Sequence, residues 1–416
     1  MASETPAPTL SANGATIEAF GADVPKDRPG LVEIGFVVAG TLSDPALHAV
    51  RGAAHDLCET LSAAFSDFHW RLTVIVRPEP ETDGAKQAET SALLRLANRE
   101  RARAHWDFAF AVTGRDLKTY YRDRAFAAPS RALDCAVLSL ARLEPDAADQ
   151  DNESTLRARI EALVLHLFGH LNTLGHHSDP DNYMCEFEEA PELDRMRRFS
   201  DGDRDILHAA LVRVADARME ERDGGRVPFF SLRAIWANRH DLAEAVLRAK
   251  PWLFPLLFSR LTTAALSTLL VLSVTAEAWE LGMTRSPSLV VLLSIVVLVG
   301  TSAFILVRQQ LLPGKGPRHL SEQRVVVATA AALIMLWGML TVYVLLFAAS
   351  FGFGLILISE ELARAWAPTL EAAPDLAHYA TMAGFTAALG SLIGALGASF
   401  EGNSYFRHVV FIDEET

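Results

Sequence analysis

The residues best suited to do chemistry lie between His166 and Met184, in the stretch HLFGHLNTLGHHSDPDNYM. His166 and His170 are four residues apart, which puts both imidazoles on one face of a helix, about one turn from each other. His176 follows six residues later, beyond a turn, and can swing back toward the first two. Zinc favours neutral imidazole nitrogens in a tetrahedral site. The spacing therefore predicts a Zn²⁺ site made by His166, His170 and His176, with His177 as an alternative third ligand.

This stretch resembles the signature of the metzincin metallopeptidases, H-E-x-x-H-x-x-G-x-x-H followed by a methionine turn. The resemblance implies that the three histidines are the ligands. It also implies that Met184 lies in the turn beneath them as an apolar floor. Thr173 stands where the family has a turn glycine, a place that favours a positive φ. Gly175 or Asn172 could take over that conformation.

The second departure from the family pattern is Leu167, which occupies the position of the general-base glutamate. General acid–base catalysis of this kind contributes about 10²- to 10⁴-fold in rate. Leu167 cannot supply it, so the catalytic residue stays unknown. Acidic residues that follow the third histidine are candidates for a substitute, namely Asp179, Asp181, Glu186 and Glu188.

The elements that must position these residues follow from the hydrophobic pattern. We expect strands over 31–39, 70–76, 106–112 and 133–143, and helices over 44–65, 88–104, from about 153 through His170, and from a Ser200 N-cap to about 216. This alternation predicts an α/β domain. It is similar to the N-terminal subdomain of metzincins, and of archaemetzincin-type proteins in particular, over roughly residues 31–220.

Composition divides the 416 residues into two parts. Half of the residues are apolar, and the excess is concentrated after residue 250. The net charge of −13 argues against nucleic acid as a partner. The cysteines, Cys58, Cys135 and Cys185, are widely spaced, which is typical of free thiols in a reducing compartment.

The sequence of the second part, after residue 250, predicts an all-α bundle of about four transmembrane helices. The apolar segments lie at about 261–279, 286–307, 325–349 and 379–399, each long enough to cross a hydrocarbon core of ~30 Å. The predicted division is a disordered leader over 1–29, the metzincin-like zinc-binding domain over 30–222, a linker with an amphipathic interfacial helix over 223–251, the bundle over 252–408 and a tail over 409–416. Packing of the amphipathic helix on the soluble domain is an alternative to an interfacial position. Gly390 and Gly394 form a G-x-x-x-G that allows close helix contact, within the chain or in a homo-oligomer.

Loop charges predict the orientation. The 308–324 loop carries four basic residues, whereas the 359–378 loop is mainly acidic. The basic loop should be cytoplasmic, which places both termini on that side of a multi-pass protein of the cell (inner) membrane.

Three functions agree with these observations. The first is a membrane-anchored, cytosol-facing zinc metallopeptidase that acts on a peptide or protein substrate, impaired or served by a substitute base. The second is a catalytically inactive pseudo-peptidase that binds zinc or a peptide and acts as a membrane sensor or scaffold. The third is a multi-pass membrane protein with incidental histidines.

Overall fold

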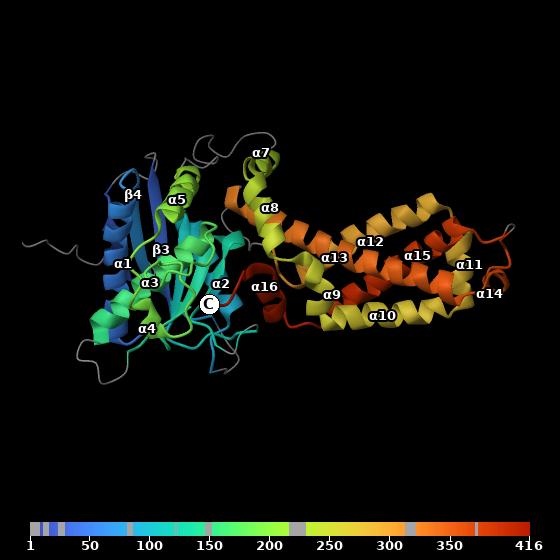
Figure 1. Ribbon diagram of the computed structural model, residues 1–416, viewed down its shortest axis with the longest axis horizontal. Coiled ribbons are helices and arrows are strands. Elements are labelled where there is room, and N and C mark those ends of the chain that lie inside the picture. Colours follow the sequence, from blue (N-terminus) through green and yellow to red (C-terminus); the bar gives the residue numbers. More distant parts are fainter. Residues whose placement is uncertain are drawn as a thin grey trace, which may run out of the picture. The chain divides into compact units, whose positions relative to one another are not determined.

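The computed structural model describes residues 9–10, 16–23, 30–80, 86–120, 122, 124–145, 152–215, 230–312, 322–370 and 373–416 (Figure 1). The chain forms two compact units. The first contains Met1–Ala234, Gly314–Val325 and Phe411–Thr416, and the second contains Ile235–Pro313 and Val326–Val410. The start of the predicted linker and amphipathic helix over 223–251, residues 223–229, lies outside the described residues.

The first unit is built on one mixed seven-stranded sheet, with the order β1-β2-β4-β3-β5-β7-β6. Its strands are β1 (Thr9–Leu10), β2 (Thr16–Gly21), β3 (Leu31–Ala39), β4 (His69–Arg77), β5 (Phe108–Thr113), β6 (Ala127–Ser130) and β7 (Cys135–Ser139). The central strands β4, β3, β5 and β7 are parallel, and β2 and β6 join them in antiparallel register. Every residue of strand β3 is buried, including Glu33, because both faces of the sheet are covered there.

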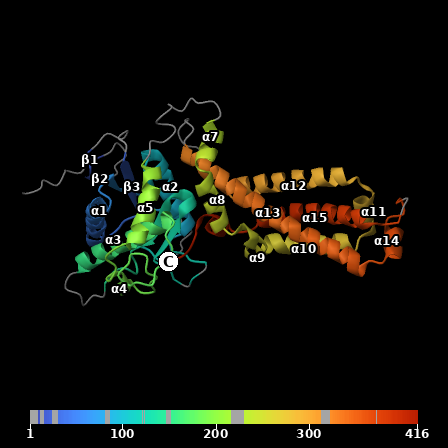
Figure 2. The same cartoon turned by 45° about the horizontal axis from the view of Figure 1, so that its top comes forward.

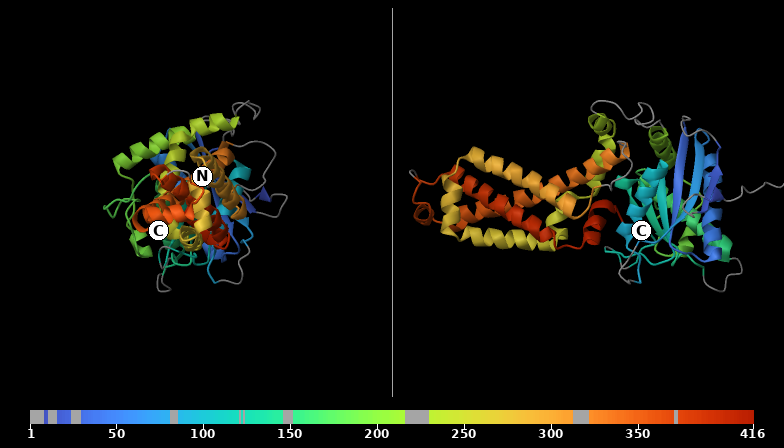
Figure 3. Two further views of the ribbon diagram at one scale, coloured as in Figure 1. Left: turned by 90° about the vertical axis from the view of Figure 1, so that its right-hand side faces the viewer. Right: turned by 180° about the vertical axis from the view of Figure 1, so that it is seen from behind.

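Helices cover both faces of this sheet, seen from behind in Figure 3. They are α1 (Asp44–Ala64), α2 (Thr90–Ala104), α3 (Asn152–Leu171), α4 (Ala190–Leu193) and α5 (Asp201–Val214), with a 3₁₀ turn, η1, at Arg131–Leu133. Alternate residues of β3, such as Ile34 and Phe36, belong to one core together with α1 and α3. On the opposite face Gly35 lies against the ring of Trp106, where a Cβ atom would come within 1.8 Å of a ring carbon. The predicted α/β class is confirmed.

The prediction of a disordered leader over 1–29 is wrong for Thr16–Gly21. This segment is strand β2, which pairs along β4 from Ile17↔Ile75 to Gly21↔Arg71. Its order comes from backbone pairing on an available sheet edge, which a leader rich in small and polar residues does not reveal. The predicted strand over 133–143 is shorter, since β7 spans only Cys135–Ser139.

The second unit is entirely helical in the described residues. Its elements are α8 (Arg239–Arg248), η2 (Pro251–Leu253), α9 (Phe254–Leu257), α10 (Ser259–Ser273), α11 (Ala276–Thr284), α12 (Pro287–Arg308), α13 (Glu322–Leu357), α14 (Glu360–Trp366), α15 (Leu376–Ala398) and α16 (Asn403–Phe411), preceded by α7 (Phe230–Ala237) at the boundary between the units. Figure 2 shows α10, α12, α13 and α15 as the long helices of this unit. The expected amphipathic helix is therefore two helices, α7 and α8, that meet at Asn238.

In the part of the chain that the structure describes, three helices are long and apolar enough to cross a membrane, namely Pro287–Arg308, Val325–Leu357 and Leu376–Ala398. There is a fourth candidate span only if Leu242–Leu257 and Ser259–Ser273 together form one broken span. These two segments are bent by 54° at their junction. The predicted single span over 261–279 is wrong, because α10 ends at Ser273 and a new helix begins at Ala276.

The glycines of the G-x-x-x-G pattern have close neighbours inside the chain. A Cβ atom on Gly394 would lie 3.0 Å from Cβ of Ala265 in α10, and one on Gly390 would lie 3.1 Å from a methyl group of Leu346 in α13. A buried pair, Ser350 and Thr386, joins α13 to α15 with their hydroxyl oxygens 2.8 Å apart. The small residues of α15 thus allow close packing within the bundle.

Candidate metal centre

Helix α3 carries the first two histidines on one buried face. His166 is 0% exposed and His170 is 4% exposed, and their Nε2 atoms are 2.9 Å apart. Two neutral imidazoles can approach this closely by sharing a proton, or by sharing a cation that both lone pairs bind. The predicted one-turn spacing thus brings both nitrogens to one point.

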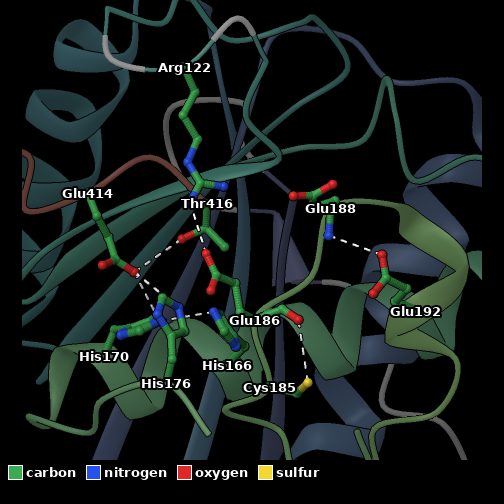
Figure 4. A network of polar contacts seen from close by, with 10 residues as sticks. All are labelled: Arg122, His166, His170, His176, Cys185, Glu186, Glu188, Glu192, Glu414 and Thr416. Atoms are coloured by element: carbon green, nitrogen blue, oxygen red, sulfur yellow. Dashed lines mark hydrogen bonds and ion pairs between the residues drawn. The ribbon is translucent and has the colours of Figure 1, made fainter. Parts of the chain in front are cut away.

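His176 completes the cluster from the loop after α3. Its ring centroid lies 4.8 Å from that of His170 and 5.5 Å from that of His166. One ring nitrogen of each histidine lies within 4.8 Å of the others (Figure 4). The alternative ligand His177 is not in this cluster. Its Nδ1 instead accepts a hydrogen bond of 3.1 Å from the backbone N–H of Asp179.

The surroundings of His166 prepare it as a metal ligand. Its Nδ1 lies 2.7 Å from the carbonyl oxygen of Tyr183, so Nδ1 carries the proton and Nε2 keeps its lone pair toward the cluster. Burial, followed by the neighbouring His170, lowers the pKa of His166 to about 3. The imidazole is therefore neutral at physiological pH, which is the form that binds a metal ion. Three neutral imidazole nitrogens form a donor set that fits Zn²⁺.

Hydrogen bonds at the C-terminal end of α3 set the direction of the loop that brings His176 back to the other two histidines. The Leu174 N–H donates to the Gly169 carbonyl at 3.0 Å, and the Thr173 N–H donates to the His170 carbonyl at 3.2 Å. These two bonds form a Schellman cap, in which the residue after the C-cap takes a left-handed conformation. That residue is Thr173, with φ +80°. The expectation that Gly175 or Asn172 takes over this conformation is wrong, since neither has a positive φ.

Met184 packs directly against α3 at Gly169. It is 0% exposed, and a Cβ atom built on Gly169 would lie 2.2 Å from its Sδ. The Met184 carbonyl also accepts a hydrogen bond of 2.8 Å from the His177 N–H. A glycine between the two histidines of α3 is thus what lets Met184 approach the helix.

The loop that follows is tied to α5. Asn182 accepts a 2.9 Å hydrogen bond from the Met184 N–H through Oδ1, and its amide donates to Asp203 at 2.7 Å. Asp203 also closes the capping box with Ser200, which confirms Ser200 as the N-cap of this helix. These contacts fix the segment that supplies the carbonyl partner of His166.

Leu167 is 0% exposed and belongs to the hydrophobic core. Two of the four acidic residues expected to replace the missing base, Glu186 and Asp179, pair with arginines instead. Glu186 pairs with Arg122 at 3.2 Å, and Asp179 pairs with Arg198 at 3.7 Å. Glu414 forms ion pairs with two histidines of the cluster.

The sequence alone does not predict Glu414 as a residue of the site. Its Oε1 lies 3.1 Å from His170 Nε2 and 3.6 Å from His176 Nε2, as Figure 4 shows. No spacing rule connects a glutamate at this position to histidines far earlier in the chain. The signal comes only from the fold, which returns Phe411–Thr416 to the first unit.

No protein-family model matches the chain, and no curated protein does. Among solved structures it is similar to archaemetzincin from Methanopyrus kandleri, with 20% identity and a TM-score of 0.36, over 45% of this chain and 98% of that one. It is similar to a zinc-dependent peptidase from Methanocorpusculum labreanum, with 22% identity and a TM-score of 0.34, over 42% and 99% of the two chains. It is also similar to metalloproteinase-II from Bacteroides fragilis, with 12% identity and a TM-score of 0.30, over 45% and 55%.

Proposed function

We propose that the first unit is a metzincin-like, zinc-dependent domain that binds peptides, with or without cutting them, and that the apolar helices anchor it to a membrane. The observation that carries the proposal is the cluster of His166, His170 and His176, whose nitrogens lie within 4.8 Å of one another. The hydrogen bond from His166 to the Tyr183 carbonyl supports a metal role, because ligating histidines are oriented by such partners. In this proposal the bound Zn²⁺ would supply Lewis-acid activation, and the three imidazoles would hold it.

The zinc domain has two candidate modes of action. Hydrolysis needs a proton-transferring group, and Leu167 at the family's position is buried in the core. This observation favours the second mode, in which the domain binds zinc and a peptide without cutting it.

Exposed apolar side chains support the membrane anchor. On α12 the residues Val291, Leu292, Ile295, Val296 and Val299 are each between 54% and 60% exposed. A contiguous apolar surface of this kind on a helix of 22 residues is suited to lipid. The basic loop at 308–324 favours a cytoplasmic position for it. We therefore propose a multi-pass protein of the cell membrane whose zinc domain lies on the cytosolic side.

The test uses the full chain in detergent micelles with a mixed peptide library, followed by mass spectrometry. The variants are His170→Ala and, as a matched control, His177→Ala, whose ring lies outside the cluster. A peptidase predicts cleavage that is lost with chelator and in His170→Ala and kept in His177→Ala. Zinc-dependent peptide retention without cleavage would assign the second mode. Cleavage that persists in His170→Ala would contradict the role of the cluster.

A further inference from the structure

Residues Asp413–Thr416 lie along the edge strand β6. The Ala127 N–H donates to the Thr416 carbonyl at 3.1 Å, and the Thr416 N–H donates to the Ala127 carbonyl at 3.0 Å. The Asp413 N–H donates to the Pro129 carbonyl at 3.1 Å. The segment therefore runs antiparallel to β6 and satisfies backbone groups that a sheet edge exposes. Extended peptides bind to sheet edges in this way.

Two side chains anchor the segment on either side of Glu414. The Asp413 carboxylate accepts a 2.7 Å hydrogen bond from the Arg131 N–H. The Glu415 carboxylate accepts hydrogen bonds from the Tyr120 N–H at 2.7 Å and from the Arg122 N–H at 2.8 Å. Glu415 is only 4% exposed. Such specific contacts fix the register of the segment against the sheet.

The alternation of side chains along an extended segment decides where Glu414 points. Neighbouring side chains in an extended chain face opposite ways. Because Asp413 and Glu415 reach backbone amides of the first unit, Glu414 faces the opposite side, where the histidines lie (Figure 4). The hydroxyl of Thr416 donates to Glu414 Oε1 at 3.3 Å and helps to hold it there.

Two distances from Glu414, to His170 and to His176, match those between ligands of one metal ion. A tetrahedron with zinc–ligand bonds of ~2.0–2.1 Å has edges of about 3.3 Å. Glu414 Oε1 lies 3.1 Å and 3.6 Å from the nitrogens of His170 and His176, and the nitrogens of His166 and His170 are 2.9 Å apart. A carboxylate oxygen is also a ligand type that zinc accepts.

We propose that Glu414 is the fourth ligand of the metal centre and that residues 413–416 occupy the peptide-binding edge as an internal ligand. This inference rests on the proposed zinc site. A zinc site with four protein ligands is closed, whereas one that acts on a substrate keeps a position open. The centre opens only when the segment leaves β6. Because the segment continues directly from α16 and α15, its release is covalently linked to the apolar helices.

The test of the ligand uses Co²⁺ as a spectroscopic probe in the full chain in detergent micelles, with azide added to occupy any open position. The variant is Glu414→Ala. The matched control is Glu186→Ala, which removes a nearby carboxylate that pairs with Arg122. We expect azide to change the visible spectrum of Glu414→Ala and to leave wild type and Glu186→Ala unchanged. The zinc dissociation constant of Glu414→Ala should rise at least ~10-fold.

The outcomes separate the two proposals. Wild type that binds Co²⁺ but responds to azide as Glu414→Ala does would overturn the fourth ligand and leave the histidine site standing. Wild type that binds neither Co²⁺ nor Zn²⁺ would overturn the proposed function and this inference together.

A second measurement addresses the segment itself. Asp413→Ala combined with Glu415→Ala removes both anchors and keeps Glu414. Hydrogen exchange of the Phe126 and Ala127 amides, which donate to Thr416, should become faster than in wild type. The same peptides should exchange unchanged in Glu186→Ala. Equal protection of these amides in the doubly substituted chain would overturn the docking of the segment.

Discussion

Thr173 is held in a conformation that its side chain disfavours, and this gives a quantitative prediction. At φ +80° it is the left-handed residue of the cap that ends α3. For a residue with a Cβ atom this conformation costs roughly 1–2 kcal/mol. Glycine avoids that cost, but it adds about 0.4–1 kcal/mol of chain entropy to the unfolded state. Thr173→Gly should therefore stabilise the first unit by about 0.5–1 kcal/mol.

The assay is hydrogen exchange of the full chain in micelles, read in peptides that cover Asn152–Leu171. A gain of this size should slow exchange of the most protected amides by about two- to five-fold. Thr173→Ala is the matched control, since it truncates the side chain but keeps the Cβ atom, and it should stay within ~0.5 kcal/mol of wild type. Equal effects of the two substitutions, or faster exchange in Thr173→Gly, would refute the argument from backbone strain.

Three further predictions concern residues around the cluster. Gly169→Ala should destabilise the unit by about 1–3 kcal/mol through overpacking, and combining it with Met184→Ala should remove that penalty, as a double-mutant cycle of unfolding free energies would test. Burial raises the pKa of the Cys135 thiol to about 12, so at pH 8 it stays protonated and resists alkylation, whereas the partly exposed Cys185 reacts; labelling of Cys135 before unfolding would contradict this. Leu167→Glu places a carboxylate where the side chain is 0% exposed and should cost several kcal/mol relative to Leu167→Met, measured by the same exchange experiment.

Local sequence patterns predicted most of the strands and helices of the first unit. The strand at 31–39 and the helix from 44 were predictable because β-rich composition and helical periodicity leave a direct trace in the sequence. The histidine spacing predicted which side chains would meet, since two positions lie one turn apart on one helix. Strand β6 was not predictable, because it is short and contains Pro129, which is typical of an edge strand.

Two features of the site depend on tertiary structure alone. Glu414 reaches the cluster only because residues 411–416 return to the first unit, which no periodicity encodes. The left-handed Thr173 goes against local preference, and the Schellman bonds around it are made only once α3 has formed. The end of α10 at Ser273 was also not predictable, because apolar residues continue on the C-terminal side of the break between α10 and α11.

The central claim is that three histidines hold one metal ion. The most direct test is elemental analysis of the purified full chain, with wild type beside His166→Ala. One zinc per chain in wild type and none in His166→Ala is the predicted result. Stoichiometric zinc that persists in His166→Ala, or no metal in wild type after reconstitution with Zn²⁺, would contradict the claim.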